Sequence, residues 1–166
     1  MLIRIANEKD AEGIFAVRKK TVSEQNYFVT ITEEFKVDIE SQKAKIFQNK
    51  QNGGLNLVAD DSGRIVGFLT FKRNPLKRLN HTGSFGMGIL EDYRNQGIGY
   101  KMLRNLIIWA KKQNGLEKIC LGVLSTNERA IATYKKAGFE EEGREIRQIK
   151  FENGKYADNI LMGLII

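Results

Sequence analysis

The residues with the clearest chemical potential lie in the segment DYRNQGIGYKM (92–102), where an arginine precedes two glycines at the start of an apolar, helix-patterned run. The first amides of a helix have no intrahelical partner, and the helix macrodipole makes this end partly positive. Gly97 and Gly99 would expose bare backbone to an anion, and the guanidinium of Arg94 adds a fork of donors. The segment Arg94-x-x-Gly97-x-Gly99 therefore predicts either a phosphate-binding loop or only a tight turn.

Two common phosphate-binding patterns do not fit this loop. The sequence has no GxxxxGK[ST], which excludes a nucleotide triphosphate loop of that type. The pattern GxGxxG fails because its third glycine position is Met102, and no strand–loop–helix of the dinucleotide-binding kind opens the chain. The loop alone therefore does not identify its anion.

The composition indicates one globular domain over residues 1–166, since 42% of the residues are apolar and 28% are charged. No apolar run is long enough to span a membrane, and the N-terminus lacks the pattern of a signal peptide. Cys120 is the single cysteine, so an intramolecular disulfide is excluded and a reducing compartment is favoured. We expect a cytoplasmic protein without membrane contact, in which Cys120 is a buried core thiol rather than a nucleophile.

The charge balance favours anionic ligands, because 27 Lys and Arg residues face 20 Asp and Glu residues and give a net charge of +7. These basic residues are spread along the chain, and only KRNPLKR (72–78) is dense. Aromatic residues do not alternate with them there, as they do on a platform for stacking single-stranded bases. Nucleic acid is therefore the weaker alternative, and we do not expect it as a partner.

The hydrophobic pattern predicts the elements that position the loop. An apolar stripe at helical spacing follows the glycines from Ile98 to Ala110. Thr30 and Glu33 have capping-box spacing before a helix that reaches about Asn49, with Phe35 on its apolar side. The full predicted order is strand 2–6, helix 7–23, helix 30–49, strands 55–60, 64–71 and 83–90, helix 98–113, strand 117–124, helix 127–137, and strands 144–151 and 155–166, the last two joined by an Asn-Gly turn. This order predicts a mixed α/β fold around one sheet.

The strand GSFGMGIL (83–90) before the loop carries a further signal. Glycine inside a strand often marks a bulge or the close approach of another backbone. Gly86 and Gly88 therefore predict one of these two features, or only a local irregularity of the strand.

The block from Gly83 to Phe139 resembles the GNAT superfamily of acetyl-CoA-dependent N-acetyltransferases. Four pieces carry the resemblance in the right order: the strand GSFGMGIL, the loop RNQGIG (94–99), the helix after it and the run NERAIATYKKAGF (127–139). The N-terminal strand and helices and the closing hairpin GKYADNILMGLI (154–165) are also similar. The resemblance implies an α/β fold with a mostly antiparallel sheet of about seven strands and about four flanking helices.

The resemblance further implies how acetyl-CoA is bound, with no metal. The loop would hold the CoA pyrophosphate, and the glycine-rich strand would be bulged, splay from strand 117–124 and pair with the pantetheine arm near Met87 and Ile89. Asn127 matches a position that contacts this arm, or it is only a helix cap. The implied cofactor-binding residues are Met87, Ile89, Arg94, Asn95, Gln96, Gly97, Ile98, Gly99, Tyr100 and Asn127.

The catalytic residue that the resemblance implies is Tyr134, which matches the tyrosine that protonates the departing thiolate. Its alternative role is packing within its helix. Many relatives carry a glutamate base early in the glycine-rich strand, where this chain has Ser84. We expect Ser84 to contact the acceptor, but serine is a poor base unaided, so the amine proton would leave through water or to a carboxylate elsewhere. Glu33 and Glu34 lie where the acceptor pocket usually is, and they would hold an ammonium group or serve only as capping and solvated residues.

The predicted function is transfer of an acetyl group from acetyl-CoA to the amine of a small molecule, an amino acid or a protein N-terminus, by direct attack in a ternary complex. The alternative is a CoA-binding or sensor module without turnover, which the missing glutamate makes conceivable. The closing strand ILMGLII (160–166) is apolar enough to form a homodimer interface, or it belongs to the core.

Overall fold

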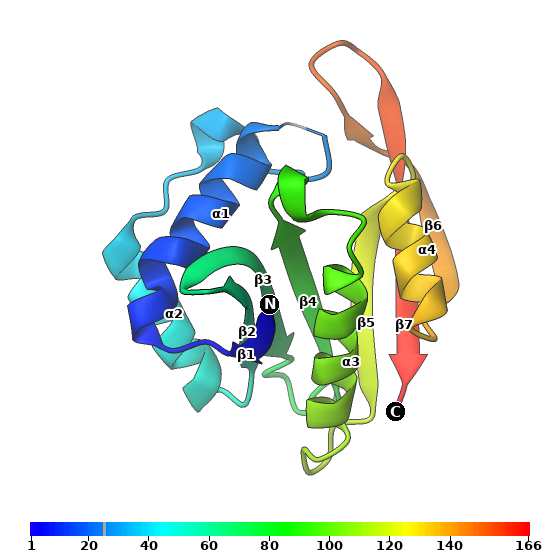
Figure 1. The fold of residues 1–166 in the computed structure, drawn as a ribbon. Coiled ribbons are helices and arrows are strands. Elements are labelled where there is room, and N and C mark those ends of the chain that lie inside the picture. The colour runs from blue at the N-terminus through cyan, green and yellow to red at the C-terminus, as the bar shows by residue number, and fades with distance from the viewer. Residues whose placement is uncertain (25) are drawn as a thin grey trace.

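The computed structural model describes residues 1–24 and 26–166, and in this part of the chain seven strands form one sheet with helices on both faces (Figure 1). The predicted order of strands and helices and the mixed α/β class are confirmed. Short 3₁₀ turns at Glu8–Asp10, Thr32–Glu34 and Glu91–Tyr93 join the main elements. These elements are β1 (Leu2–Ile5), α1 (Ala11–Ser23), α2 (Ile39–Gln51), β2 (Leu55–Asp61), β3 (Arg64–Arg73), β4 (Thr82–Ile89), α3 (Ile98–Ala110), β5 (Lys118–Leu124), α4 (Glu128–Lys136), β6 (Glu140–Lys150) and β7 (Tyr156–Ile165).

The strand order β1-β2-β3-β4-β5-β7-β6 contains one parallel pair among the described residues, β4 with β5. This pairing stops after three residues, at Ser84 opposite Cys120. Beyond that point β4 continues beside β3 to Ile89, while β5 continues beside β7 to Leu124. The two strands therefore diverge, as the resemblance implied, and they leave an opening in the middle of the sheet (Figure 1).

The glycine-rich strand β4 is not bulged against β3. Its register runs without a shift from Gly67 opposite Ile89 to Arg73 opposite Gly83. A Cβ built on Gly88 would lie 2.6 Å from the ring of Phe68, whereas one on Gly86 would meet nothing within 4 Å. Gly88 therefore allows close packing across the strand pair, and the face of β4 at Gly86 is open.

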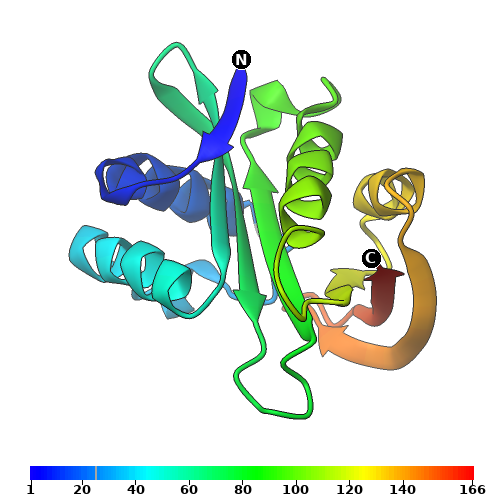
Figure 2. The ribbon, with the colours of Figure 1, turned by 90° about the horizontal axis from the view of Figure 1, so that it is seen from below.

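The helices cover opposite faces of the sheet, with α1 and α2 on one side and α3 and α4 on the other (Figure 2). The apolar stripe predicted for α3 is confirmed, since its six members are buried: Ile98, Met102, Leu103, Leu106, Ile107 and Ala110. A smaller core under α1 and α2 contains Ile14, Val17, Ile46, Val58 and Phe68. Burial of these two stripes fixes the helices on the sheet and so fixes the ends that border the opening.

The second helix starts later than its capping-box spacing predicted. Thr30 and Glu33 do not cap it; a 3₁₀ turn occupies 32–34, and α2 begins at Ile39. Asp38 is the cap, because its carboxylate accepts from the amide of Ser41 at 2.7 Å while the Ser41 hydroxyl accepts from the amide of Asp38 at 3.2 Å. The prediction was wrong because this second box, eight residues further along the chain, makes the reciprocal bonds.

The closing hairpin forms as its Asn-Gly turn predicted, with Gly154 at a φ of +79°. β7 lies between β5 and β6, and its Ile160 and Met162 are buried in the core. Cys120 does not lie in the core as predicted; it is half-buried and outside both core clusters. Among the described residues, no helix has the length and apolar character needed to cross a membrane.

Candidate active site

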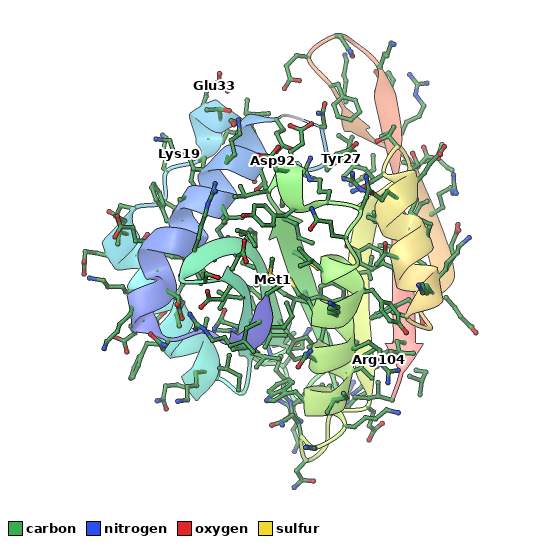
Figure 3. The ribbon with its side chains drawn as sticks, in the orientation of Figure 1. Met1, Lys19, Tyr27, Glu33, Asp92 and Arg104 are labelled. Carbon is green, nitrogen blue, oxygen red and sulfur yellow. The ribbon has the colours of Figure 1, made fainter. Side chains whose placement is uncertain are left out.

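The opening between β4 and β5 leads to a cavity of about 230 Å³, which we call the splay cleft. The ends of β4, α3 and α4 and the segment after α1 form its walls, and Figure 3 shows Tyr27 of that segment beside the loop that carries Asp92. Nine of the ten predicted cofactor-binding residues and the predicted acid line it: Met87, Ile89, Arg94, Asn95, Gly97, Ile98, Gly99, Tyr100, Asn127 and Tyr134. The tenth predicted cofactor-binding residue, Gln96, does not line the splay cleft. Its side-chain amide instead donates to the carbonyl of Asp92 at 2.8 Å.

The start of α3 offers bare backbone to the splay cleft. Gly97 is the N-cap with a φ of +75°, and its lack of a side chain leaves the first helical amides without a side-chain cap. A Cβ at Gly97 would meet nothing within 4 Å, so the space beside these amides is free. Gly99 differs, since the side chains of Met87 and Ile89 pack at 3.4 and 3.5 Å from its Cβ position. The Gly97 side of this turn therefore has the free amides and open space of an anion-binding helix start.

Arg94 does not point freely into the splay cleft. Its Nε donates to the carbonyl of Ile89 at 2.9 Å, and one Nη forms an ion pair with Glu24. The pair is largely buried, with side-chain exposures of 14% and 11%. Arg94 thus ties the end of β4 to the end of α1, a role that the sequence did not suggest because 70 positions separate the two partners.

Positive charge in the splay cleft comes also from α4, through residues that the loop motif did not indicate. Lys136 lies 4.9 Å from the ring centre of Tyr100, and Arg129 lies 5.7 Å from that of Tyr27. All four side chains line the cleft. Arg129, Thr133 and Lys136 follow the i, i+4, i+7 spacing of one helix face, so a helical projection of 127–138 could have found them.

Tyr134 lies at the inner end of the splay cleft in an aromatic cluster. Its ring centre is 5.8 Å from that of Phe85 and 6.1 Å from that of Phe139. Burial raises the pKa of its hydroxyl to about 12, because the phenolate would lose its hydration. Tyr134 therefore keeps its proton at neutral pH. Asn127 has its capping geometry, since its side-chain oxygen accepts from the amide of Ala130 at 3.3 Å.

A second cavity of about 280 Å³, which we call the side pocket, adjoins the splay cleft. Thr21 and Phe28 line both spaces, so the two meet at the end of α1. The remaining lining residues are Arg18, Val22, Thr30, Glu34, Phe35, Val37 and Phe68. The resemblance indicated an acceptor pocket near Glu34, but the other lining residues were not predicted, because α1, the segment before α2 and β3 contribute them from distant positions.

The residues predicted to contact the acceptor lie in different places. Glu34 lines the side pocket, and its carboxylate accepts from the amide of Ile31 at 3.3 Å. Glu33 is exposed at the outer end of the same turn (Figure 3) and lines neither cavity. Ser84 is exposed at the last paired position before β4 and β5 diverge. Of the three, only Glu34 lines a cavity that shares lining residues with the splay cleft.

Comparison with known proteins agrees with this geometry. The model of the Acetyltransferase (GNAT) family matches residues 23–139, which include the splayed strand, the loop and α4. The chain belongs to the GNAT family of acetyltransferases. The acetyltransferase of the GNAT family from Streptococcus pneumoniae has the same fold, with a TM-score of 0.94, 29% identity and 99% of each chain covered.

Two curated relatives of this GNAT protein act on amino acids by name. It is 32% identical to the L-amino acid N-acetyltransferase AaaT of Escherichia coli over 109 residues, which cover 66% of this chain and 67% of that one. It is 27% identical to the L-methionine sulfoximine/L-methionine sulfone acetyltransferase of Pseudomonas aeruginosa over 164 residues, covering 98% and 92%. The protein is thus an acetyl-CoA-dependent N-acetyltransferase.

Proposed function

We propose that this GNAT acetyltransferase transfers the acetyl group of acetyl-CoA to the primary amine of a small acceptor of the amino-acid type. The observation that carries the proposal is the junction of the splay cleft and the side pocket at Thr21 and Phe28. The splay cleft offers free helical amides and cationic side chains for a phosphorylated cofactor, and the side pocket offers apolar walls for a compact acceptor, so both can be bound together. The names of the relatives support an amino-acid acceptor.

In this proposal the splay cleft holds acetyl-CoA. The first amides of α3, from Ile98 to Tyr100, bind its phosphates next to Gly97, while Arg129 and Lys136 add positive charge. The backbone of β4 at Met87 and Ile89 binds the arm, because β5 no longer pairs with it there. Acetyl-CoA supplies a thioester carbonyl at the inner end of the cleft.

The chemistry needs an uncharged amine and a proton for the thiolate. The amine nitrogen attacks the thioester carbon, the new C–N bond forms, and the C–S bond breaks with its electron pair on sulfur. The Tyr134 hydroxyl gives its proton to the sulfur and regains one from the amine nitrogen, so the balance closes without a covalent enzyme intermediate. Cys120 lines neither cavity, and burial raises the pKa of its thiol, so it does not serve as a nucleophile.

Release of free thiol from acetyl-CoA, measured with a panel of amino acids, polyamines and an alanine-starting peptide, tests this function. We expect turnover with free amino acids above that with peptides and polyamines. Thermal stabilisation by CoA with no turnover on any amine would instead favour the binding module. Binding to DNA or RNA that weakens steeply with salt would favour the nucleic-acid alternative.

A further inference from the structure

Arg18 of α1 is partly buried, and among the described residues it has no carboxylate partner. Its guanidinium lies 4.5 Å from the ring centre of Phe68, and one Nη donates to the hydroxyl of Thr70 at 3.3 Å. Its Nε is buried and has no hydrogen-bond partner among the described residues. Burial lowers the pKa of this guanidinium, yet arginine stays charged at neutral pH. A buried charge of this kind is costly unless something pairs with it.

Other partly buried arginines of the chain show what Arg18 lacks. Arg4 pairs with Asp10 at 2.7 Å and with Asp60 at 2.9 Å, and Arg94 pairs with Glu24. Each of these two holds strands and helices together through carboxylates of the chain. Among the described residues no carboxylate lies within ion-pair distance of Arg18, although Glu34 lines the same pocket. The guanidinium is thus available to a ligand.

The position of Arg18 relative to β4 indicates where a ligand bound to its guanidinium would extend. Its contacts Phe68 and Thr70 pair across the sheet with Gly88 and Gly86 of β4. The ring of Phe68 and the hydroxyl of Thr21 fill the space over Gly88, whereas nothing lies within 4 Å of the Cβ position of Gly86, so the open path toward the edge of β4 passes over Gly86. A ligand held by Arg18 can therefore reach from the side pocket toward the splay cleft.

The walls of the side pocket define the rest of the ligand. Its apolar lining surrounds Arg18, and Glu34 is the other charged residue among the described ones that line it; the apolar members are Val22, Phe28, Phe35, Val37 and Phe68. Its volume of about 280 Å³ is at the lower end of the range for ligand sites, so it suits a small molecule. An anionic group at Arg18 and an apolar body against these walls are the features that it would recognise.

We propose that Arg18 binds the α-carboxylate of an amino-acid acceptor whose side chain is apolar, and that this contact directs the α-amine toward β4. The inference rests on the proposed function and specifies its acceptor. A planar guanidinium binds a carboxylate with two parallel hydrogen bonds, which fixes orientation as well as charge. Arg18 is in this respect a specificity-determining residue, and an amide or a decarboxylated amine lacks the group that it holds.

The test compares Arg18→Met with Lys19→Met, which makes the same chemical change at an exposed neighbour on α1 (Figure 3). The acceptors are L-leucine, L-methionine and L-phenylalanine, each beside its amide and its decarboxylated amine. We expect Arg18→Met to lower kcat/KM for the amino acids about hundredfold and for the amides less than about threefold. Lys19→Met leaves both values unchanged, and Arg18→Lys regains part of the loss on the amino acids.

A binding measurement separates this inference from the proposed function. Calorimetric titration of the same amino acids into the CoA-bound protein reports carboxylate recognition without turnover, and unchanged CoA affinity shows that Arg18→Met is folded. Binding that depends on Arg18 upholds the inference even if no amine is acetylated, an outcome that would refute the proposed function alone. Equal use of acids and amides, equal losses on both in Arg18→Met, or neither binding nor acetylation of any amino acid by the wild type would overturn the inference.

Discussion

The splay cleft and the side pocket lie next to each other but are built in different ways. The cleft takes most of its lining from two short stretches, 87–100 and 127–136, and much of its binding surface is backbone at the start of α3. The pocket takes its lining from α1, from 28–37 and from β3, and its binding groups are side chains. In the function that we propose, local backbone geometry holds the common cofactor, and side chains from distant positions hold a particular acceptor.

The difference has a physical origin. A pyrophosphate is recognised by a row of free amides, which any sequence with the right turn and helix start supplies. An acceptor is recognised by the charge and shape of its own groups, which requires particular side chains at the pocket wall. Substitutions in the cleft should therefore affect every acceptor equally, whereas substitutions in the pocket should affect acceptors selectively.

The largest expected effect is at the inner end of the cleft, with Tyr134→Phe. Loss of the proton donor should lower kcat about hundredfold for every acceptor, because the thiolate then leaves unprotonated. The Kd of acetyl-CoA should change less than about threefold, since the aromatic packing with Phe85 and Phe139 is kept. Steady-state kinetics and equilibrium binding measure the two quantities. An unchanged kcat would remove Tyr134 from the chemistry.

The second effect concerns the backbone of the cleft, with Gly97→Val matched by Gly154→Val in the hairpin turn. Both glycines have positive φ, +75° and +79°, and neither has an atom within 4 Å of its Cβ position, so the strain is alike. Each variant should lose about 1 kcal/mol or more of stability. Only Gly97→Val should weaken CoA binding, by about thirtyfold, because its side chain fills the space next to the free amides.

Calorimetric titration with CoA measures this contrast. Equal CoA affinity in the two glycine variants would show that the turn at Gly97 serves the fold and not the cofactor.

The third expected effect is a change in stability with pH that follows from the burial of the Tyr134 hydroxyl. Burial raises the pKa of the Tyr134 hydroxyl to about 12 in the folded protein, against about 10 in the unfolded chain. The protonated hydroxyl therefore contributes its full stabilisation below about pH 10, and this stabilisation is lost as the pH rises through about 12. Between about pH 9 and pH 11, the free energy of unfolding of the wild type should fall by about 1.3 kcal/mol more than that of Tyr134→Phe. Urea denaturation at each pH measures this difference, and parallel pH curves would mean that the hydroxyl is hydrated.

The smallest effect is on the pocket side, with Phe35→Ala. Phe35 lines the side pocket and stacks on Phe15 at 6.0 Å between ring centres. Its removal should raise the KM of apolar acceptors about fivefold through lost apolar contact and leave the KM of acetyl-CoA unchanged. Phe47→Ala on the exposed side of α2 is the control and should change neither value. A rise in the KM of acetyl-CoA instead would mean that the two spaces act as one site.

The elements that local patterns define were predictable from the sequence. The stripe from Ile98 to Ala110, the Asn153-Gly154 turn and the order of strands and helices follow from periodicity and turn chemistry, which act over a few residues. The start of α2 was not predicted, because two capping boxes compete in 30–41 and only packing decides between them. The half-exposed position of Cys120 was also missed, since an apolar run does not say which face of a strand meets the core.

The sequence by itself determined the loop at Arg94–Gly99, its helix and the run with Tyr134, because the amides and spacing that a cofactor needs are local properties. Only the tertiary structure decided what surrounds them. It paired Arg94 with Glu24, ended the β4–β5 pairing at Ser84, and left Arg18 without an ion pair to any described residue in a pocket beside the cleft. These contacts join residues far apart in the chain, and their energies depend on burial and partners that exist only once the sheet and its helices have packed.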